Sequence, residues 1–136
     1  MTRDQLPLGS GELVLVVEDD DQVREVTLKR IESLGYAVTE ARTGPKAIQL
    51  LKSEEPVLLV LSDIVMPGGM TGYDVARWVA PNRPEIQVIL CSGYNEEDNR
   101  GDVRSSLGDV VVLGKPYSRD QLARALSNAL APPKMD

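Results

Sequence analysis

Five short apolar runs alternate with longer segments of helical spacing along most of this chain, and this alternation limits the possible folds most strongly. The runs Leu13–Val17 and Val57–Ser62 are continuous and rich in Val and Leu, which is typical of strands buried on both faces. The other expected strands are Tyr36–Ala41, Ile86–Cys91 and Val110–Leu113. Strands separated by helical segments form right-handed βαβ units, so we predict a parallel sheet with helices on both faces.

The segments between these runs carry helix-start signals and helical periodicity. Apolar residues from Val23 to Leu34 predict a first helix, and Pro45 suits the first turn of a second. Residues Thr71–Asp74 and Ser118–Gln121 resemble capping boxes, which begin two further helices. A weaker helix is expected over Asn95–Leu107. Five strands and five helices then form a three-layer α/β sandwich.

Chain length and the composition of both ends predict one domain with short tails. The chain has 136 residues, and domains typically hold roughly 100–200. We expect a domain over residues 12–131, a flexible tail or linker over 1–11 and a C-terminal tail over 132–136, because Pro and Gly interrupt both ends. The longest apolar run is too short to cross a bilayer, and the first dozen residues do not resemble a signal peptide. A cytoplasmic protein without a membrane partner is therefore expected.

Several function classes are excluded by composition. The net charge of −6 argues against nucleic acid as a partner, since such surfaces need clustered Lys and Arg. The chain has no His, which removes His-ligated zinc sites and the Ser-His-Asp and Cys-His types of catalysis. The single Cys91 excludes an intrachain disulfide, fits a reducing compartment and lies in an expected strand, as inert core residues do.

Polar side chains follow four of the five expected strands at their carboxyl ends. Glu18 and Asp19 follow the first strand and Asp63 follows the third. Ser92 follows the fourth strand and Lys115 the fifth. Open parallel sheets bind ligands beyond the carboxyl ends of their strands. We therefore expect these side chains to meet at one edge of the sheet.

The types of residue at this edge suit a magnesium ion and a phosphoryl group. The carboxylates of Glu18, Asp19 and Asp63 would repel one another without a cation, and oxygen ligands suit Mg²⁺. Carboxylates also form covalent phosphoryl intermediates, and a metal with Lys115 would neutralise the charge on a transferring group. The alternative is that the first two acids cap the next helix and that Asp63 only begins a turn.

Taken together, the strand-end residues resemble the receiver domain of two-component response regulators. The motifs are Glu18–Asp19, Asp63 within SDIVMPGGMTG, Ser92–Gly93 and Lys115–Pro116, and the similarity covers about residues 12–131. This resemblance implies the flavodoxin-like fold with strand order 2-1-3-4-5. The segments GGMTG and LPLGSGE look most like receivers at the C-terminus of hybrid sensor histidine kinases. A free-standing receiver is equally compatible with the sequence.

The resemblance implies a phosphotransfer role for the chain. Asp63 is the expected phosphoacceptor, taking its phosphoryl group from a histidine kinase or a histidine phosphotransfer protein. Mg²⁺ is the expected cofactor, held by Glu18, Asp19, Asp63 and the backbone carbonyl of Val65. Lys115 is expected to pair with Asp63 and afterwards with the phosphoryl group.

The resemblance also implies a conformational switch. Ser92 is the expected switch hydroxyl, the backbones of Val65 and Gly93 would contact the phosphoryl group, and the bond before Pro116 would be cis. The switch would act on the face formed by the fourth helix, fifth strand and fifth helix, which could also form a weak homodimer. Val112 departs from the family, where an aromatic residue often stands three positions before the lysine.

Two alternatives to a phosphorylated receiver differ in their expected chemistry. Phosphatases that resemble haloacid dehalogenases carry a second acid two residues after the nucleophile, where this chain has Val65. We therefore expect no enzyme with a separate substrate, only slow self-dephosphorylation. A receiver-like interaction module that signals without phosphorylation is the second alternative, and it should not bind Mg²⁺ at millimolar concentrations.

Overall fold

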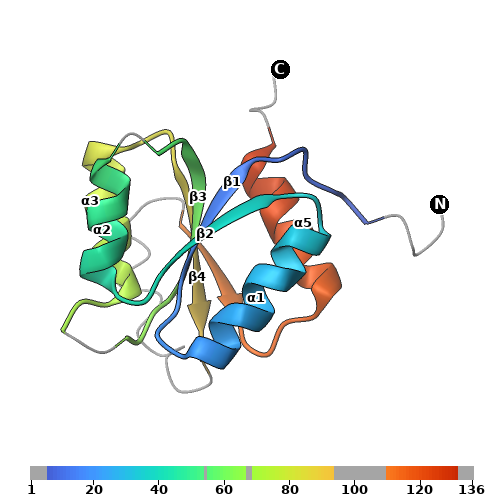
Figure 1. The fold of residues 1–136 in the computed structure, drawn as a ribbon, viewed down its shortest axis with the longest axis horizontal. Helices are drawn as coiled ribbons and strands as arrows, with labels where there is room; N and C mark the ends of the chain where they lie inside the picture. Colours follow the sequence, from blue (N-terminus) through green and yellow to red (C-terminus); the bar gives the residue numbers. More distant parts are fainter. Residues whose placement is uncertain (1–5, 54, 67–68, 94–109, 132–136) are drawn as a thin grey trace.

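A five-stranded parallel sheet forms the centre of the molecule (Figure 1). The computed structural model describes residues 6–53, 55–66, 69–93 and 110–131. The sheet has the order β2-β1-β3-β4-β5, and all its paired neighbours are parallel, which confirms the predicted fold class. Its strands are β1 (Leu13–Val17), β2 (Ala37–Ala41), β3 (Val57–Asp63), β4 (Gln87–Ser92) and β5 (Val111–Gly114).

Helices cover both faces of this sheet, as Figure 1 shows. Helices α1 (Asp21–Ser33) and α5 (Arg119–Leu130) lie on one face. Helices α2 (Gly44–Lys52) and α3 (Gly72–Asn82) lie on the other. The helix expected over Asn95–Leu107 falls outside the described residues.

Successive residues of β1 belong to two different cores, which explains why this strand is apolar throughout. Val14 and Val16 pack in the core beneath α1 and α5. Leu15 and Val17 pack in the core beneath α2 and α3. All four side chains are buried because each face of the strand is covered.

Side-chain caps set where the helices begin. The Asp20 side chain accepts hydrogen bonds from the backbone N–H groups of Gln22 and Val23 at the start of α1. Both predicted capping boxes are present, with Thr71 and Asp74 at α3 and Ser118 and Gln121 at α5. These caps fix the helix starts beside the carboxyl edge of the sheet.

The segment before β1 is attached to the turn between α1 and β2. The N–H of Gly9 donates to the carbonyl of Leu34 at 2.7 Å, and the N–H of Gly11 donates to the carbonyl of Gly35 at 2.8 Å. Leu6 packs against the core beneath α1 and α5. Among the described residues, no helix has the length and apolar character needed to cross a membrane.

Candidate functional site

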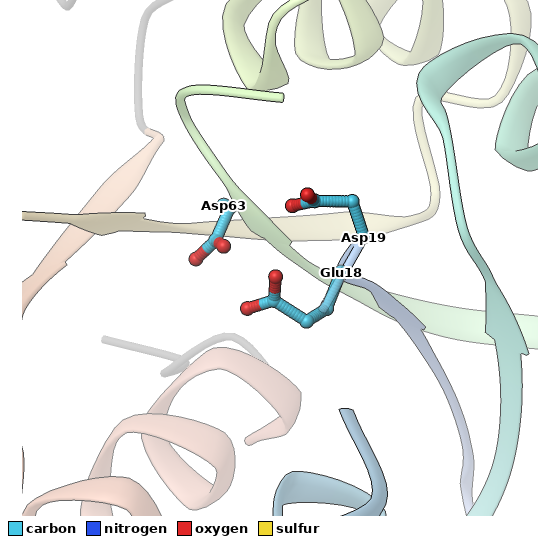
Figure 2. A group of neighbouring side chains, drawn as sticks. All are labelled: Glu18, Asp19 and Asp63. Carbon is cyan, nitrogen blue, oxygen red and sulfur yellow. The ribbon is translucent and has the colours of Figure 1, made fainter. Parts of the chain in front are cut away.

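Three carboxylates meet at the carboxyl edge of the sheet. Glu18 and Asp19 directly follow β1, and Asp63 ends the neighbouring strand β3. Each contributes a carboxylate oxygen to a group whose members lie within 4.8 Å of one another. Figure 2 shows the three side chains pointing into a common space. The structure therefore brings together the acids that the sequence places at the ends of separate strands.

Hydrogen bonds hold the loop that carries two of these acids. The N–H of Glu18 donates to the carbonyl of Ala41 at the end of β2, at 3.1 Å. The Glu18 carboxylate in turn accepts from the N–H of Asp20 at 3.1 Å. Glu18 is buried, with 6% of its surface exposed, whereas Asp19 is exposed. The pocket thus has one deeply held carboxylate and one that faces solvent.

Lys115 reaches the acids from the far side of β4. Its ammonium group forms an ion pair with Asp63, and its Nζ lies 3.8 Å from Oε1 of Glu18. The backbone N–H of Lys115 donates to the carbonyl of Ser92 at 2.8 Å, which holds the chain against β4. The Lys115–Pro116 peptide bond is cis, the geometry that the resemblance implies.

Burial and mutual contact change the protonation of these groups. Burial, followed by a hydrogen bond with Asp63, raises the pKa of Glu18 to about 8. Burial opposes the charge on Lys115, but the hydrogen bond and charge of Asp63 outweigh it and raise the pKa of Lys115. Without a metal, Glu18 therefore tends to keep its proton at neutral pH.

The same pocket fits a hard divalent cation. Its donors are carboxylate oxygens, which suit Mg²⁺ better than softer metals. A cation there would replace the proton on Glu18 and relieve the repulsion among the three acids. The residues present therefore fit the metal that the sequence predicts.

The other residues predicted for the site differ in burial and in the element that carries them. Ser92 is buried at the end of β4, and its hydroxyl donates to the carbonyl of Gly93 at 3.0 Å. Val65 is exposed in the loop after β3, with 61% of its surface accessible. Val112 lies on β5 and packs against the core beneath α2 and α3.

Cys91 is a core residue beneath the pocket. It is buried in β4, and this burial raises the pKa of its thiol to about 12. The thiol is therefore protonated at neutral pH, as expected for an inert core position.

Gly72 has a role at the site that the sequence alone did not show. A Cβ atom at this position would lie 2.3 Å from the carbonyl oxygen of Asp63 and 3.1 Å from Cα of Ile64. The N–H of Gly72 also donates to the carbonyl of Ile64 at 2.8 Å. The first turn of α3 thus packs directly on the backbone that carries Asp63. The sequence marks Gly72 only as part of a helix cap.

The chain is similar in sequence to a response regulator receiver protein and to part of a sensor kinase. The family model of the response regulator receiver domain matches residues 14–127. The sensor kinase CckA of Brucella abortus is 34% identical over 124 residues, which are 90% of this chain and 13% of that protein. The response regulator receiver protein CpdR of the same organism is 32% identical over 117 residues, 86% of this chain and 95% of that protein.

Solved structures agree with this similarity. The response regulator TrrA of Thermotoga maritima, solved with Mg²⁺ and BeF, has a TM-score of 0.76 and 27% identity, covering 88% of this chain and 99% of that one. A receiver domain protein of Clostridium thermocellum shares the fold with a TM-score of 0.81 at 22% identity, covering 88% of this chain and 94% of that one. With the acidic pocket of Glu18, Asp19 and Asp63, this chain belongs to the response regulator receiver domain family, the phosphoacceptors of two-component signalling.

Proposed function

We propose that Asp63 accepts a phosphoryl group from a phosphohistidine on a histidine kinase or a histidine phosphotransfer protein. The observation that carries this assignment is the ion pair of Lys115 with Asp63, formed where two further carboxylates converge. Asp63 lies at the centre of that arrangement and retains partial exposure, so a donor can reach it. Glu18, Asp19, Asp63 and the Val65 carbonyl would hold Mg²⁺.

The transfer needs an ionised Asp63 oxygen that can attack phosphorus. A carboxylate oxygen of Asp63 forms the new P–O bond while the P–N bond to the donor histidine breaks, and its electron pair stays on the imidazole nitrogen. Lys115 stabilises the ionised form of Asp63 and lies close enough to pair with the transferred group. When bound, Mg²⁺ neutralises charge on the phosphoryl oxygens.

Ser92 is the hydroxyl that would respond to the new charge. A phosphorylated Asp63 carries about −2 in place of −1. The Ser92 hydroxyl, which donates to the Gly93 carbonyl in the present structure, would then find a stronger acceptor in a phosphoryl oxygen. Its turn would draw the segment after β4 towards the pocket, with backbone contacts from Val65 and Gly93. Val112 replaces the usual aromatic partner of this movement.

An apolar pocket beside the acids offers a docking surface for the phosphoryl donor. It is lined by residues of α1 and of the β5–α5 loop, including Val23, Val26, Pro116 and Tyr117. Val23 and Val26 are 43% and 50% exposed. We assign this surface to the phosphoryl donor, because Lys115, which pairs with Asp63, is one of the residues that line it.

Whether the receiver is free-standing or attached to a kinase bears on where the phosphoryl group goes next. The similarity to the sensor kinase CckA supports a receiver attached to a hybrid kinase, whereas the similarity to CpdR supports a free-standing one. A hybrid-kinase receiver would pass its phosphoryl group on to a histidine phosphotransfer protein. Transfer from the phosphorylated chain to such a protein supports the first context. Hydrolysis without transfer contradicts it.

Incubation with acetyl phosphate tests the proposed function. We expect one labile phosphoryl adduct by intact mass with Mg²⁺, and none with EDTA or in the Asp63→Asn variant. Asp120→Asn, which changes an acid in the first turn of α5, should behave like the unmodified chain. A folded protein that binds no Mg²⁺ at millimolar concentrations and accepts no phosphoryl group from acetyl phosphate or a phosphotransfer protein would favour the interaction module. Consumption of acetyl phosphate faster than the phosphorylated protein hydrolyses would contradict the expectation that the chain has no separate enzymatic activity.

A further inference from the structure

The guanidinium of Arg24 is buried beside the acidic pocket and bonds to three separate groups. Its Nη2 donates to Oδ1 of Asp21 at 2.7 Å and its Nε donates to Oε1 of Glu40 at 2.8 Å. Its Nη1 donates to the backbone carbonyl of Glu18 at 3.0 Å. The side chain is only 8% exposed. One residue of α1 therefore joins the helix, β2 and the loop that carries the pocket acids.

The bond to the Glu18 carbonyl acts on the peptide unit between two of those acids. This carbonyl belongs to the planar peptide group that joins Glu18 to Asp19. A hydrogen bond that holds the carbonyl therefore restrains the orientation of that group, and with it the directions of the Glu18 and Asp19 side chains. The N–H of Glu18 is held from the other side by the carbonyl of Ala41 at 3.1 Å. The backbone of Glu18 is thus fixed at both of its hydrogen-bonding groups.

Attraction between charges alone does not account for the burial of Arg24. Arg42 also pairs with Oδ1 of Asp21, at 2.9 Å, from a side chain that is 59% exposed. Exposed pairs of this kind contribute little to stability, and burying a guanidinium costs desolvation. The helix nevertheless buries Arg24 while its apolar neighbours Val23 and Val26 are left exposed. Two further bonds distinguish Arg24 from Arg42: the ion pair with Glu40 and the hydrogen bond to the Glu18 carbonyl. Of these two, the bond to Glu18 reaches the loop that carries the pocket acids.

We propose that Arg24 is a positioning residue for the acidic pocket, orienting Glu18 and Asp19 towards Asp63 through the Glu18 carbonyl. The inference rests on the proposed magnesium-dependent function. The described hydrogen bonds of Arg24 go to Asp21, Glu40 and the Glu18 carbonyl, and none goes to a carboxylate of the pocket. Arg24 holds the carboxylates of the metal-free protein close to the arrangement that a cation requires, and it thereby increases the affinity for the metal.

Hydrogen exchange in Mg²⁺-free protein tests the positioning itself. We compare Arg24→Met with Arg42→Met, because both remove one positive charge from the same Asp21 cluster and only Arg24 bonds to the loop. The N–H groups of Glu18 and Asp20 should exchange about 10-fold faster in Arg24→Met than in Arg42→Met. Equal exchange in these two variants would overturn the proposal.

Calorimetric titration with Mg²⁺ tests the consequence for the metal. Loss of a group that orients a ligand weakens metal binding by about 10–100-fold. We expect about 10-fold weaker binding in Arg24→Met and a change of less than about 2-fold in Arg42→Met. Saturating Mg²⁺ should restore the initial rate of phosphorylation by acetyl phosphate, so the defect lies in affinity and not in the transfer step.

Arg24→Lys separates geometry from charge and serves where Arg24→Met does not fold. A lysine keeps the positive charge but lacks the planar fork that reaches three acceptors. We expect Arg24→Lys to lose several-fold in Mg²⁺ affinity while circular dichroism shows a native fold. Wild-type affinity in Arg24→Lys would overturn the proposal. An unmodified chain that takes no phosphoryl group on Asp63 would instead refute the proposed function, whatever the exchange data show.

Discussion

At the scale of single residues, Glu18 is suited to binding a cation at a cost to the stability of the metal-free fold. This carboxyl is buried among two other acids, and its pKa is raised to about 8 by that burial and by its hydrogen bond with Asp63. An ordinary carboxyl in the unfolded chain has its pKa near 4.5. Folding without metal therefore takes up a proton wherever the pH lies between these two values.

Stability without Mg²⁺ should consequently fall as the pH rises. The contribution of Glu18 is fully present below pH 4.5 and is lost as the pH rises through about 8. We expect a loss of several kcal/mol in the free energy of unfolding over this window. Glu18→Gln should remove most of this slope and be the more stable protein at pH 8. Urea denaturation in EDTA at several pH values measures both effects.

Glu25→Gln is the matched control for this experiment, because Glu25 lies on α1 with its side chain 66% exposed. It should keep the slope of the unmodified chain. Parallel pH profiles for the unmodified chain and Glu18→Gln would contradict the assignment of the proton to Glu18.

At the scale of elements, the contact between α3 and β3 controls the position of Asp63. The missing side chain of Gly72 allows the first turn of α3 to lie against the Asp63 carbonyl. Gly72→Ala should destabilise the fold by about 2 kcal/mol, as overpacking does against a backbone that cannot give way. It should also slow phosphorylation, because relief of the clash moves the backbone of Asp63.

Gly114→Ala is the control for that change. A Cβ atom at Gly114 would meet no atom within 4 Å. This substitution should therefore change the free energy of unfolding by less than about 1 kcal/mol. Urea denaturation and the rate of adduct formation from acetyl phosphate give the two readouts. Equal behaviour of the two alanine variants would show that the contact of Gly72 has no functional effect.

Element positions could be predicted from the sequence more completely than the contacts between elements. Strand β1 has the predicted bounds, β2 begins one residue later than predicted, and β3 ends one residue later, where Asp63 pairs with Cys91. Strands β4 and β5 are each shifted by one residue towards the C-terminus, where Ser92 pairs with Gly114. Apolar runs that are buried on both faces leave few alternatives, which is why strand positions were predictable. The burial of Arg24 on α1 could not be predicted in this way, because it depends on a bond to Glu40, which lies 16 residues away in the sequence.

For the candidate site, too, the strand-end residues could be predicted from the sequence, whereas the tertiary contacts that support them could not. Convergence of the acids and Lys115 follows from the parallel sheet alone, because each residue stands at the end of a strand. The roles of Gly72 and Arg24 depend on tertiary contacts with backbone carbonyls, those of Asp63 and Glu18. Periodicity and residue type carry no information on such contacts.

At the scale of the whole molecule, the pocket links metal binding to the stability of the sheet. Its acids come from β1 and β3, and its lysine directly follows β5, so ligand binding acts on strands from both sides of β4. A ligand that binds only the folded state adds about 1.4 kcal/mol at ten times its Kd. We expect Mg²⁺ at that concentration to raise Tm by about 4 °C.

Asp19→Asn should remove most of this rise in Tm, whereas Asp120→Asn, with its change on α5, should keep it. Differential scanning calorimetry with Mg²⁺ and with EDTA provides the comparison. An undiminished rise in Asp19→Asn would place the cation somewhere other than the acidic pocket.

Chemical mapping of the phosphoryl group tests the central claim most directly. Borohydride reduces an aspartyl phosphate to homoserine, so treatment after incubation with acetyl phosphate and Mg²⁺ marks the modified position for peptide mass spectrometry. We predict that the mark is found at Asp63 alone, that EDTA prevents it and that Lys115→Met still permits it at a reduced rate. A mark at Asp19 or Glu18, or a stable adduct on a serine, would contradict the assignment of Asp63 as the phosphoacceptor.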